Sequence, residues 1–236
     1  MALRPWNPIP IRDNGEVLED LPAELLRLEP HPYASLGAPY GMDATPFRLR
    51  PGVIQRLLEA QALLQQQQPH WRLAIFDAWR PLAVQRFMVR HALEQECRNR
   101  GLDPDDPSPA RGEVERLVAR FWAPPSADPA TPPPHSTGGA VDLTLADGEG
   151  RPLAMGGAID ALGAVSEPDH HAAAAAERPG SREADWHGRR CLLAQSLASV
   201  HFAQHPNEWW HFSYGDQLWA WRQGRSVACY GRCPEG

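Results

Sequence analysis

Apolar residues recur along this chain at the spacing of helices in some stretches and at the spacing of strands in others. Pro51 and Pro81 each begin a helical stretch, which suits proline because its missing N–H is not needed in a first helical turn. Gly101 follows the second stretch and is a typical stop signal. We predict helices over four ranges: 51–68, 81–100, 113–122 and 189–202.

Aromatic and aliphatic runs dominate other stretches, which predict strands over 71–79, 140–145, 209–214 and 218–224. Helices and strands do not alternate as in parallel α/β proteins. We therefore expect an α+β fold, with a central antiparallel sheet flanked by helices. Three ranges lack a clear period: 1–50 predicts loops with short strands, 102–134 a proline-rich insertion-like segment, and 165–187 a surface loop or short helix.

Length and composition narrow the class of protein. A chain of 236 residues suits one domain, which we expect over residues 1–236. The net charge of −6 argues against a nucleic-acid partner. No apolar run of about 18 residues is present, and residues 1–16 lack the apolar core of a secretory signal. We therefore expect no membrane span and a cytoplasmic location. Four cysteines are too few for a disulfide framework, so we expect free thiols.

The segment PHSTGGAVDLTL places a histidine and an aspartate around two glycines. On a regular strand His135 and Asp142 would face opposite sides, because the spacing between them is odd. Gly138 and Gly139 permit a tight turn with positive φ, which lets His135 approach Asp142. An acidic residue in so apolar a strand needs an ion pair, hydrogen bonds or a metal.

A second segment, NEWWHFSYGDQ, adds Glu208 and His211. We predict a strand that carries His211, with Glu208 at a bend where the strand begins. His135, Asp142 and His211 would give zinc three N/O ligands and leave a fourth position for water, as in catalytic zinc sites. Glu208, beside the metal, would then act as general base.

Plainer interpretations stay open at this point. The first segment alone fits an ordinary turn, and the second fits a packed aromatic strand with a solvated Glu208 at its edge. The E-x-x-H spacing also occurs in di-iron helical bundles, which need two such motifs on helices. Glu167 and His170 form a second one, but Pro168 and a loop-like setting disfavour that interpretation.

The segment WRLAIFDAWRP ends a predicted strand with Arg80, which the following proline holds extended. An arginine fixed there can donate to a carboxylate or to the oxyanion of a tetrahedral intermediate. We expect Asp77 on the opposite face of the strand, in a structural ion pair or hydrogen bond.

Together these segments resemble the D-alanyl-D-alanine dipeptidase family of metallopeptidases, over about residues 50–222. DAWRP is similar to the family's arginine–proline after a strand, HSTGGAVDLTL to its H-x6-D segment, and EWWHFSYGDQLWA to its E-x-x-H segment. The resemblance implies a zinc peptidase fold shared with hedgehog-type zinc domains, and one Zn²⁺ per chain. It implies these roles: zinc ligands His135, Asp142 and His211, catalytic base Glu208, and transition-state stabilisation by Arg80.

The segment MGGAID looks like the family's M-G-T-x-F-D segment, which implies that Asp160 binds the substrate's free amino group. Pro133 stands where the family commonly has a serine that helps to hold the substrate. We expect the other histidines to be structural or solvent-exposed: His31, His70, His91, His170, His171, His187, His201 and His205.

The resemblance implies zinc-dependent hydrolysis of the D-Ala-D-Ala dipeptide, in the removal or recycling of a cell-wall precursor. One alternative is a D,D- or L,D-carboxypeptidase that acts on peptidoglycan peptides. A requirement for a free substrate amine would separate the two. A second alternative is a non-catalytic, hedgehog-like zinc-binding module that recognises a partner. Glu208 and Arg80 together argue against it, because a pure binder needs neither.

Overall fold

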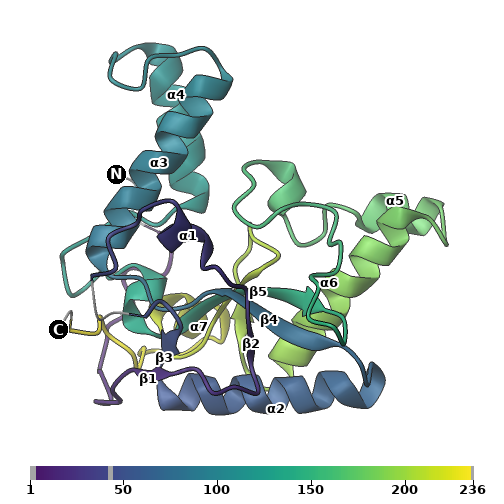
Figure 1. Ribbon diagram of the computed structural model, residues 1–236. Helices are drawn as coiled ribbons and strands as arrows, with labels where there is room; N and C mark the ends of the chain where they lie inside the picture. Colours follow the sequence, from purple (N-terminus) through teal and green to yellow (C-terminus); the bar gives the residue numbers. More distant parts are fainter. Residues whose placement is uncertain (1–3, 42–44, 235–236) are drawn as a thin grey trace.

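A five-stranded sheet runs through the centre of the protein (Figure 1). The computed structural model describes residues 4–41 and 45–234. The strand order is β2-β4-β5-β7-β6, in which β2 is parallel to β4 and all other neighbours are antiparallel. The strands are β2 (Leu26–Arg27), β4 (Arg72–Asp77), β5 (Ala140–Ala146), β7 (His211–Ser213) and β6 (Ala203–Gln204).

The predicted α+β class is confirmed, but the sheet is mixed because of the parallel edge strand β2. A long connection leads from β2 to β4, and parallel neighbours require such a crossover. A separate antiparallel pair, β1 (Glu19–Asp20) and β3 (Arg48–Leu49), lies in the same N-terminal part of the chain. The described part of residues 1–50 thus contains the predicted loops and short strands, together with one short helix, α1 (Pro32–Ser35), that the sequence did not predict.

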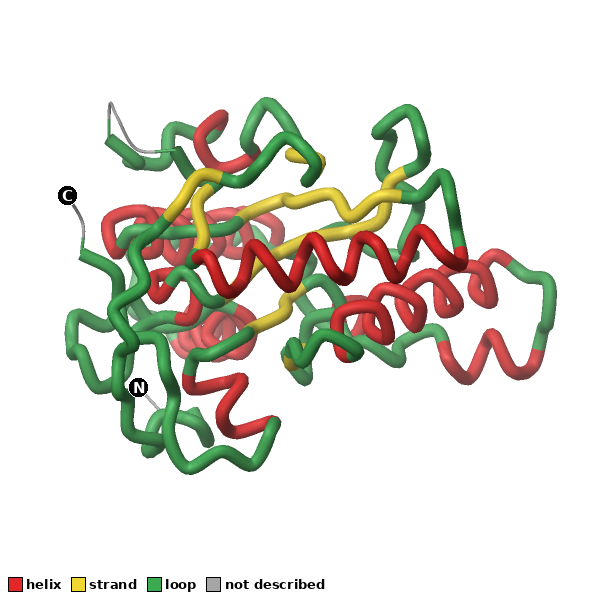
Figure 2. The backbone as a smooth tube through the Cα atoms, turned by 90° about the horizontal axis from the view of Figure 1, so that it is seen from below, coloured by secondary structure: helices red, strands yellow, loops and turns green. Residues whose placement is uncertain are grey.

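The main core lies on one face of the sheet. Helices α2 (Pro51–Gln67) and α6 (Arg182–Ala198) contact each other and this sheet. Seen from below, α2 lies in front of the central strands and covers them (Figure 2). Val141, Leu143 and Leu145 of β5 are fully buried in this core, as their alternation predicts. The polar residues between them therefore face the other side of the sheet, where the candidate site lies.

A second apolar cluster joins three helices beside that other face. Helices α3 (Leu82–Asn99) and α4 (Pro109–Phe121) pack together, and Tyr33 of α1 (Pro32–Ser35) contributes to the same cluster. Figure 1 shows α3 and α4 extending away from the sheet. Helix α4 begins earlier than the predicted 113, because the Ser108 side chain accepts a hydrogen bond from the Arg111 N–H and caps the helix.

Two sequence predictions near the C-terminus are wrong. Residues 218–222 do not form a strand but belong to helix α7 (Gln217–Arg222), because Asp216 caps the N–H of Trp219 shortly after β7, and residues 223–224 form the turn that follows. The helix predicted to begin at 189 begins at Arg182, where Ser181 is the cap. The range 165–187 does contain the expected short helix, α5 (Ala172–Glu177), after the 3₁₀ turn η2 (Ala164–Ser166).

Two further expectations concern the chain as a whole. Within residues 4–41 and 45–234, no helix is both long enough and apolar enough to cross a membrane. All four cysteines are free thiols, as the sequence predicts.

Candidate metal centre and active site

Strands β5 and β7 and the turn η1 (Pro134–Thr137) bring the three predicted ligands together. Asp142 and His211 are paired directly across β5 and β7, and His135 lies in η1 just before β5. One donor atom from each of the three residues lies within 4.8 Å of the others, and all three are buried. Gly138 has a φ of 68°, so the chain folds back between His135 and β5 through the predicted glycine turn.

A hydrogen bond to the backbone fixes the tautomer of His135. Its Nδ1 lies 2.7 Å from the carbonyl oxygen of Ala78, which can only accept, so Nδ1 carries the proton. The lone pair of the neutral ring is then on Nε2. That atom lies 3.2 Å from Nδ1 of His211 and 3.2 Å from Oδ2 of Asp142.

Hydrogen bonds through the side chains of Ser213 and Asp216 fix the tautomer of His211. Ser213 donates its hydroxyl hydrogen to Asp216 at 2.8 Å, so its oxygen accepts from Nε2 of His211 at 3.3 Å. The lone pair of His211 is then on Nδ1, which lies 3.0 Å from Oδ1 of Asp142. Such hydrogen bonds to the far side of a histidine are typical of metal ligands, since they fix tautomer and ring orientation.

These assignments leave two imidazole lone pairs and one carboxylate directed at a common point. Three acceptors so close together in a buried site need a cation between them. Two imidazoles and a carboxylate suit Zn²⁺, and the residues therefore fit the predicted metal. Within the described residues, no other such ligand group is found.

Glu208 lies beside this group, at the bend before β7 where the sequence predicts it. Its Oε2 is 3.7 Å from Nδ1 of His211, and its Oε1 is 3.5 Å from Nδ1 of His205. Oε1 is buried and accepts no hydrogen bond from any described residue. Burial, followed by the charge of Asp142, raises the pKa of Glu208 well above its usual range. A carboxylate of this kind can hold a proton near neutral pH.

Arg80 is held rigidly after β4. Its guanidinium donates to Asp77 at 2.8 Å, to Gln85 at 2.9 Å and to Asp142 at 3.3 Å. Burial opposes this charge, but Asp77 raises the pKa of Arg80 above its usual value. The expected placement of Asp77 on the opposite face is wrong, because a register shift between Ile75 and Asp77 turns it towards Arg80. Its expected structural ion pair is present.

Asp160 reaches the same cavity from the loop after β5. Its φ is 65°, a left-handed conformation that aspartate tolerates better than most residues. Oδ2 accepts a 2.8 Å hydrogen bond from the hydroxyl of Tyr33. Burial and the charge of Asp142 raise the pKa of Asp160 to about 7.

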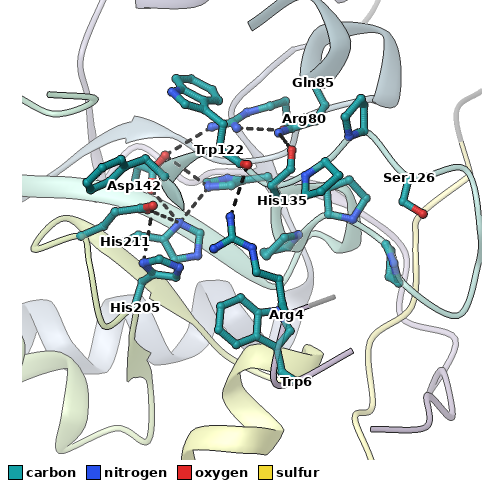
Figure 3. Close-up of a pocket in the computed structure, with 18 of the residues that line it drawn as sticks. Arg4, Trp6, Arg80, Gln85, Trp122, Ser126, His135, Asp142, His205 and His211 are labelled. Carbon is teal, nitrogen blue, oxygen red and sulfur yellow. Dashed lines mark hydrogen bonds and ion pairs between the residues drawn. The ribbon is translucent and has the colours of Figure 1, made fainter. Parts of the chain in front are cut away.

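One cavity of about 410 Å³ joins these residues. Arg80, His135, Asp142, Asp160, Glu208 and His211 all line it. Figure 3 shows Asp142, His135 and His211 side by side, with Arg80 next to them. The structure thus brings together every site residue that the sequence predicts.

Comparison with known proteins shows to which family this chain belongs. Residues 27–228 match the family model described as D-ala-D-ala dipeptidase. The chain belongs to the D-Ala-D-Ala dipeptidase family. It is 42% identical, over 98% of this chain and 97% of the relative, to a D-alanyl-D-alanine dipeptidase of Synechocystis sp.. A crystal structure of the vancomycin-resistance D,D-pentapeptidase VanY with Zn(II) is 13% identical. The structural match covers 93% of this chain and 96% of the VanY chain, with a TM-score of 0.44. The family assignment does not depend on this match.

This member of the dipeptidase family also has cavity residues that sequence reasoning missed. Arg4, Trp6 and Trp122 line the cavity, although they are far from the motifs in sequence. His205 lines it too, and its ring is buried against Trp6. Burial, followed by the charge of His211, lowers the pKa of His205 well below its usual range, so this ring is neutral. His205 precedes Glu208 at the i,i+3 spacing that brings side chains together in a turn, and this spacing is the sequence signal that could have placed His205 near the site.

Proposed function

We propose that this chain hydrolyses the D-Ala-D-Ala dipeptide with one zinc ion, held by His135, Asp142 and His211. The observation that carries the proposal is that ligand atoms of three buried residues converge within 4.8 Å, beside the oxygen of Glu208 that accepts no hydrogen bond from the described residues. The 42% identical relative, which is a D-alanyl-D-alanine dipeptidase, supports the choice of substrate. Zinc in such a site polarises a carbonyl group and makes water acidic enough to lose a proton near neutral pH.

Glu208 acts as general base and then as general acid. Its free Oε1 accepts the proton of the attacking water, and the same carboxyl group passes that proton to the leaving amine. The raised pKa of Glu208 favours the first step, because it makes the carboxylate a stronger acceptor for the proton of the water.

Arg80 stabilises the negative charge that develops on the carbonyl oxygen. Its bonds use Nε, one hydrogen of NH1 and both hydrogens of NH2, which leaves one NH1 hydrogen to donate. Asp77 and Gln85 hold the guanidinium in place, so little reorganisation is needed when the charge appears.

Asp160 binds the substrate's ammonium group. Its carboxylate lines the cavity and keeps one oxygen, Oδ1, without a hydrogen bond from the described residues. An ammonium beside it favours the ionised form and lowers the pKa of Asp160 from its value of about 7. This pairing requires a free amino terminus and therefore favours a dipeptide over longer chains. The role in removing or recycling a cell-wall precursor, and the cytoplasmic location, stay predictions.

A comparison of two substrates tests this proposal against the carboxypeptidase alternative. Initial rates are measured with D-Ala-D-Ala and with N-acetyl-D-Ala-D-Ala, using zinc-loaded protein. The proposed dipeptidase releases alanine from the free dipeptide and loses nearly all activity when the amine is acetylated. Equal or faster cleavage of the acetylated compound would instead identify a carboxypeptidase. Activity on neither compound, with zinc still bound, would favour the zinc-binding module.

A further inference from the structure

Positive side chains are scarce in the cavity. Among its described lining residues, Arg4 and Arg80 are the only arginines or lysines. Arg80 is already paired with Asp77 and Asp142, at 2.8 and 3.3 Å. The side-chain partners of Arg4, by contrast, are three neutral backbone carbonyls. Arg4 is half-buried, so its charge is partly desolvated, and no carboxylate among the described residues forms an ion pair with it.

The contacts of Arg4 place it firmly at the cavity wall. Its NH1 donates to the carbonyl of Arg120 at 3.0 Å, and its NH2 donates to those of Ala119 and Trp122 at 2.5 and 3.3 Å. These carbonyls end helix α4, where a cation is favoured. Figure 3 shows the Arg4 guanidinium directed towards the cavity, between Trp122 and the ligand histidines.

The segment that carries Arg4 is also fixed on its other side. Trp6 is 6% exposed and packs edge-on against His205, with ring centroids 5.7 Å apart. Gln217 donates to the backbone carbonyls of Asn7 and Ile9 at 3.0 and 2.6 Å. Arg4 therefore belongs to an ordered wall of the cavity.

Arg4 keeps donors that a ligand can use. A guanidinium has five N–H groups, and the three backbone bonds leave Nε–H and one NH1 hydrogen without a partner among the described residues. The neighbouring wall cannot compete for an anion, since prolines have no N–H to donate. Five prolines line it: Pro124, Pro125, Pro132, Pro133 and Pro134.

The carboxylate of Asp160 and the guanidinium of Arg4 lie in different parts of the cavity. Asp160 interacts with Tyr33 and with the charges around Arg80. Arg4 instead lies over the ring of Trp6, which packs against His205, and Nδ1 of His205 is 3.5 Å from Oε1 of Glu208. In the proposed reaction Glu208 faces the leaving amine, which belongs to the C-terminal residue of the dipeptide. Arg4 is therefore on the side where the dipeptide's carboxylate lies.

We propose that Arg4 binds the C-terminal carboxylate of the dipeptide, as the counterpart of Asp160 at the amino end. This inference rests on the proposed function and extends it to a substrate-binding residue outside the three motifs. A zwitterionic dipeptide would then be held at both ends, with its peptide bond between Glu208 and Arg80.

The test removes the charge from the substrate carboxylate and from Arg4 in turn. We would measure kcat/KM for D-Ala-D-Ala and for its C-terminal amide, D-Ala-D-alaninamide, with wild-type and Arg4→Met protein. A charged hydrogen bond predicts that the wild type prefers the free acid by about 10- to 100-fold. Arg4→Met should lower kcat/KM for the acid by a similar factor and leave the amide unchanged. Arg4→Lys, which keeps a charge, should retain part of the preference.

The amide serves as an internal control for folding. If Arg4 only fastens the chain to α4, Arg4→Met will impair both substrates equally, and the inference is wrong. A wild type that cleaves acid and amide equally well would also overturn it. Arg120→Met is the matched variant, because that side chain is 46% exposed and pairs with Glu167 outside the cavity lining. It should leave the preference intact. Wild type inactive on both substrates would contradict the proposed function itself, and this inference with it.

Discussion

Ser213 offers a direct test of how the zinc site is built, because it touches a ligand but not the metal position. Its oxygen accepts from Nε2 of His211 at 3.3 Å, and its hydroxyl donates to Asp216 at 2.8 Å. Ser213→Ala removes both bonds at a fully buried position. His211 then loses the acceptor that keeps its Nδ1 free of a proton. We therefore expect weaker zinc binding from a change that removes no ligand.

The size of the effect follows from the two lost bonds. Removing a hydrogen-bond partner of a metal-bound histidine typically weakens metal binding by about 10- to 100-fold, or about 1.4 to 2.8 kcal/mol. Each buried polar group left unsatisfied costs about 1 to 3 kcal/mol, and the substitution leaves two, Nε2 of His211 and Oδ2 of Asp216. We therefore expect folding stability to fall by about 2 to 6 kcal/mol. Activity at saturating zinc should largely return, because Glu208, Arg80 and the ligands are unchanged.

A competition titration against a chromophoric zinc chelator measures this effect at fixed pH. Ser196→Ala is the matched control, since Ser196 is also buried but bonds to the Leu192 carbonyl within α6. We expect the control to bind zinc as the wild type does. If Ser213→Ala also retained wild-type zinc affinity, the hydrogen-bond relay behind His211 would have no role in metal binding, and the tautomer argument would be refuted.

Three further predictions concern the base, the ammonium site and the core. Glu208→Gln should lower kcat by about 10²- to 10⁴-fold while metal analysis still finds zinc, whereas unchanged activity would refute its role as base. The kcat/KM of the wild type should fall as the pH drops through about 7, because Asp160 becomes protonated and loses its attraction for the ammonium group. Asp160→Asn should raise KM and abolish that part of the pH profile. Leu145→Ala should destabilise the fold by about 2 to 5 kcal/mol in urea unfolding, against less than about 0.5 kcal/mol for Val17→Ala, which is 71% exposed.

The positions of His135 and Asp142 in the candidate metal site could be predicted because both depend on local rules. The two glycines of the turn explain how His135 reaches Asp142, and the alternation within β5 places Asp142 opposite the core. The structure adds the direct pairing of Asp142 with His211 across two strands, which no spacing along one segment reveals.

Other features depend on contacts that a local pattern does not contain. The register shift that turns Asp77 towards Arg80 arises from pairing with β5 and leaves no mark in the apolar run of β4. The aromatic residues of α7 suggested a strand, but the cap at Asp216 decides the helix. Arg4 contacts carbonyls more than a hundred residues away, so its place in the cavity follows only from the tertiary fold.

The central claim is that a single zinc ion at His135, Asp142 and His211 makes this chain a D-Ala-D-Ala dipeptidase. The most direct measurement is the release of free alanine from D-Ala-D-Ala by chelator-treated protein during stepwise addition of zinc. We predict no release without metal, and activity that rises linearly to a plateau at one zinc per chain. Full activity in the metal-free protein, or no alanine release after one zinc has bound, would contradict the account.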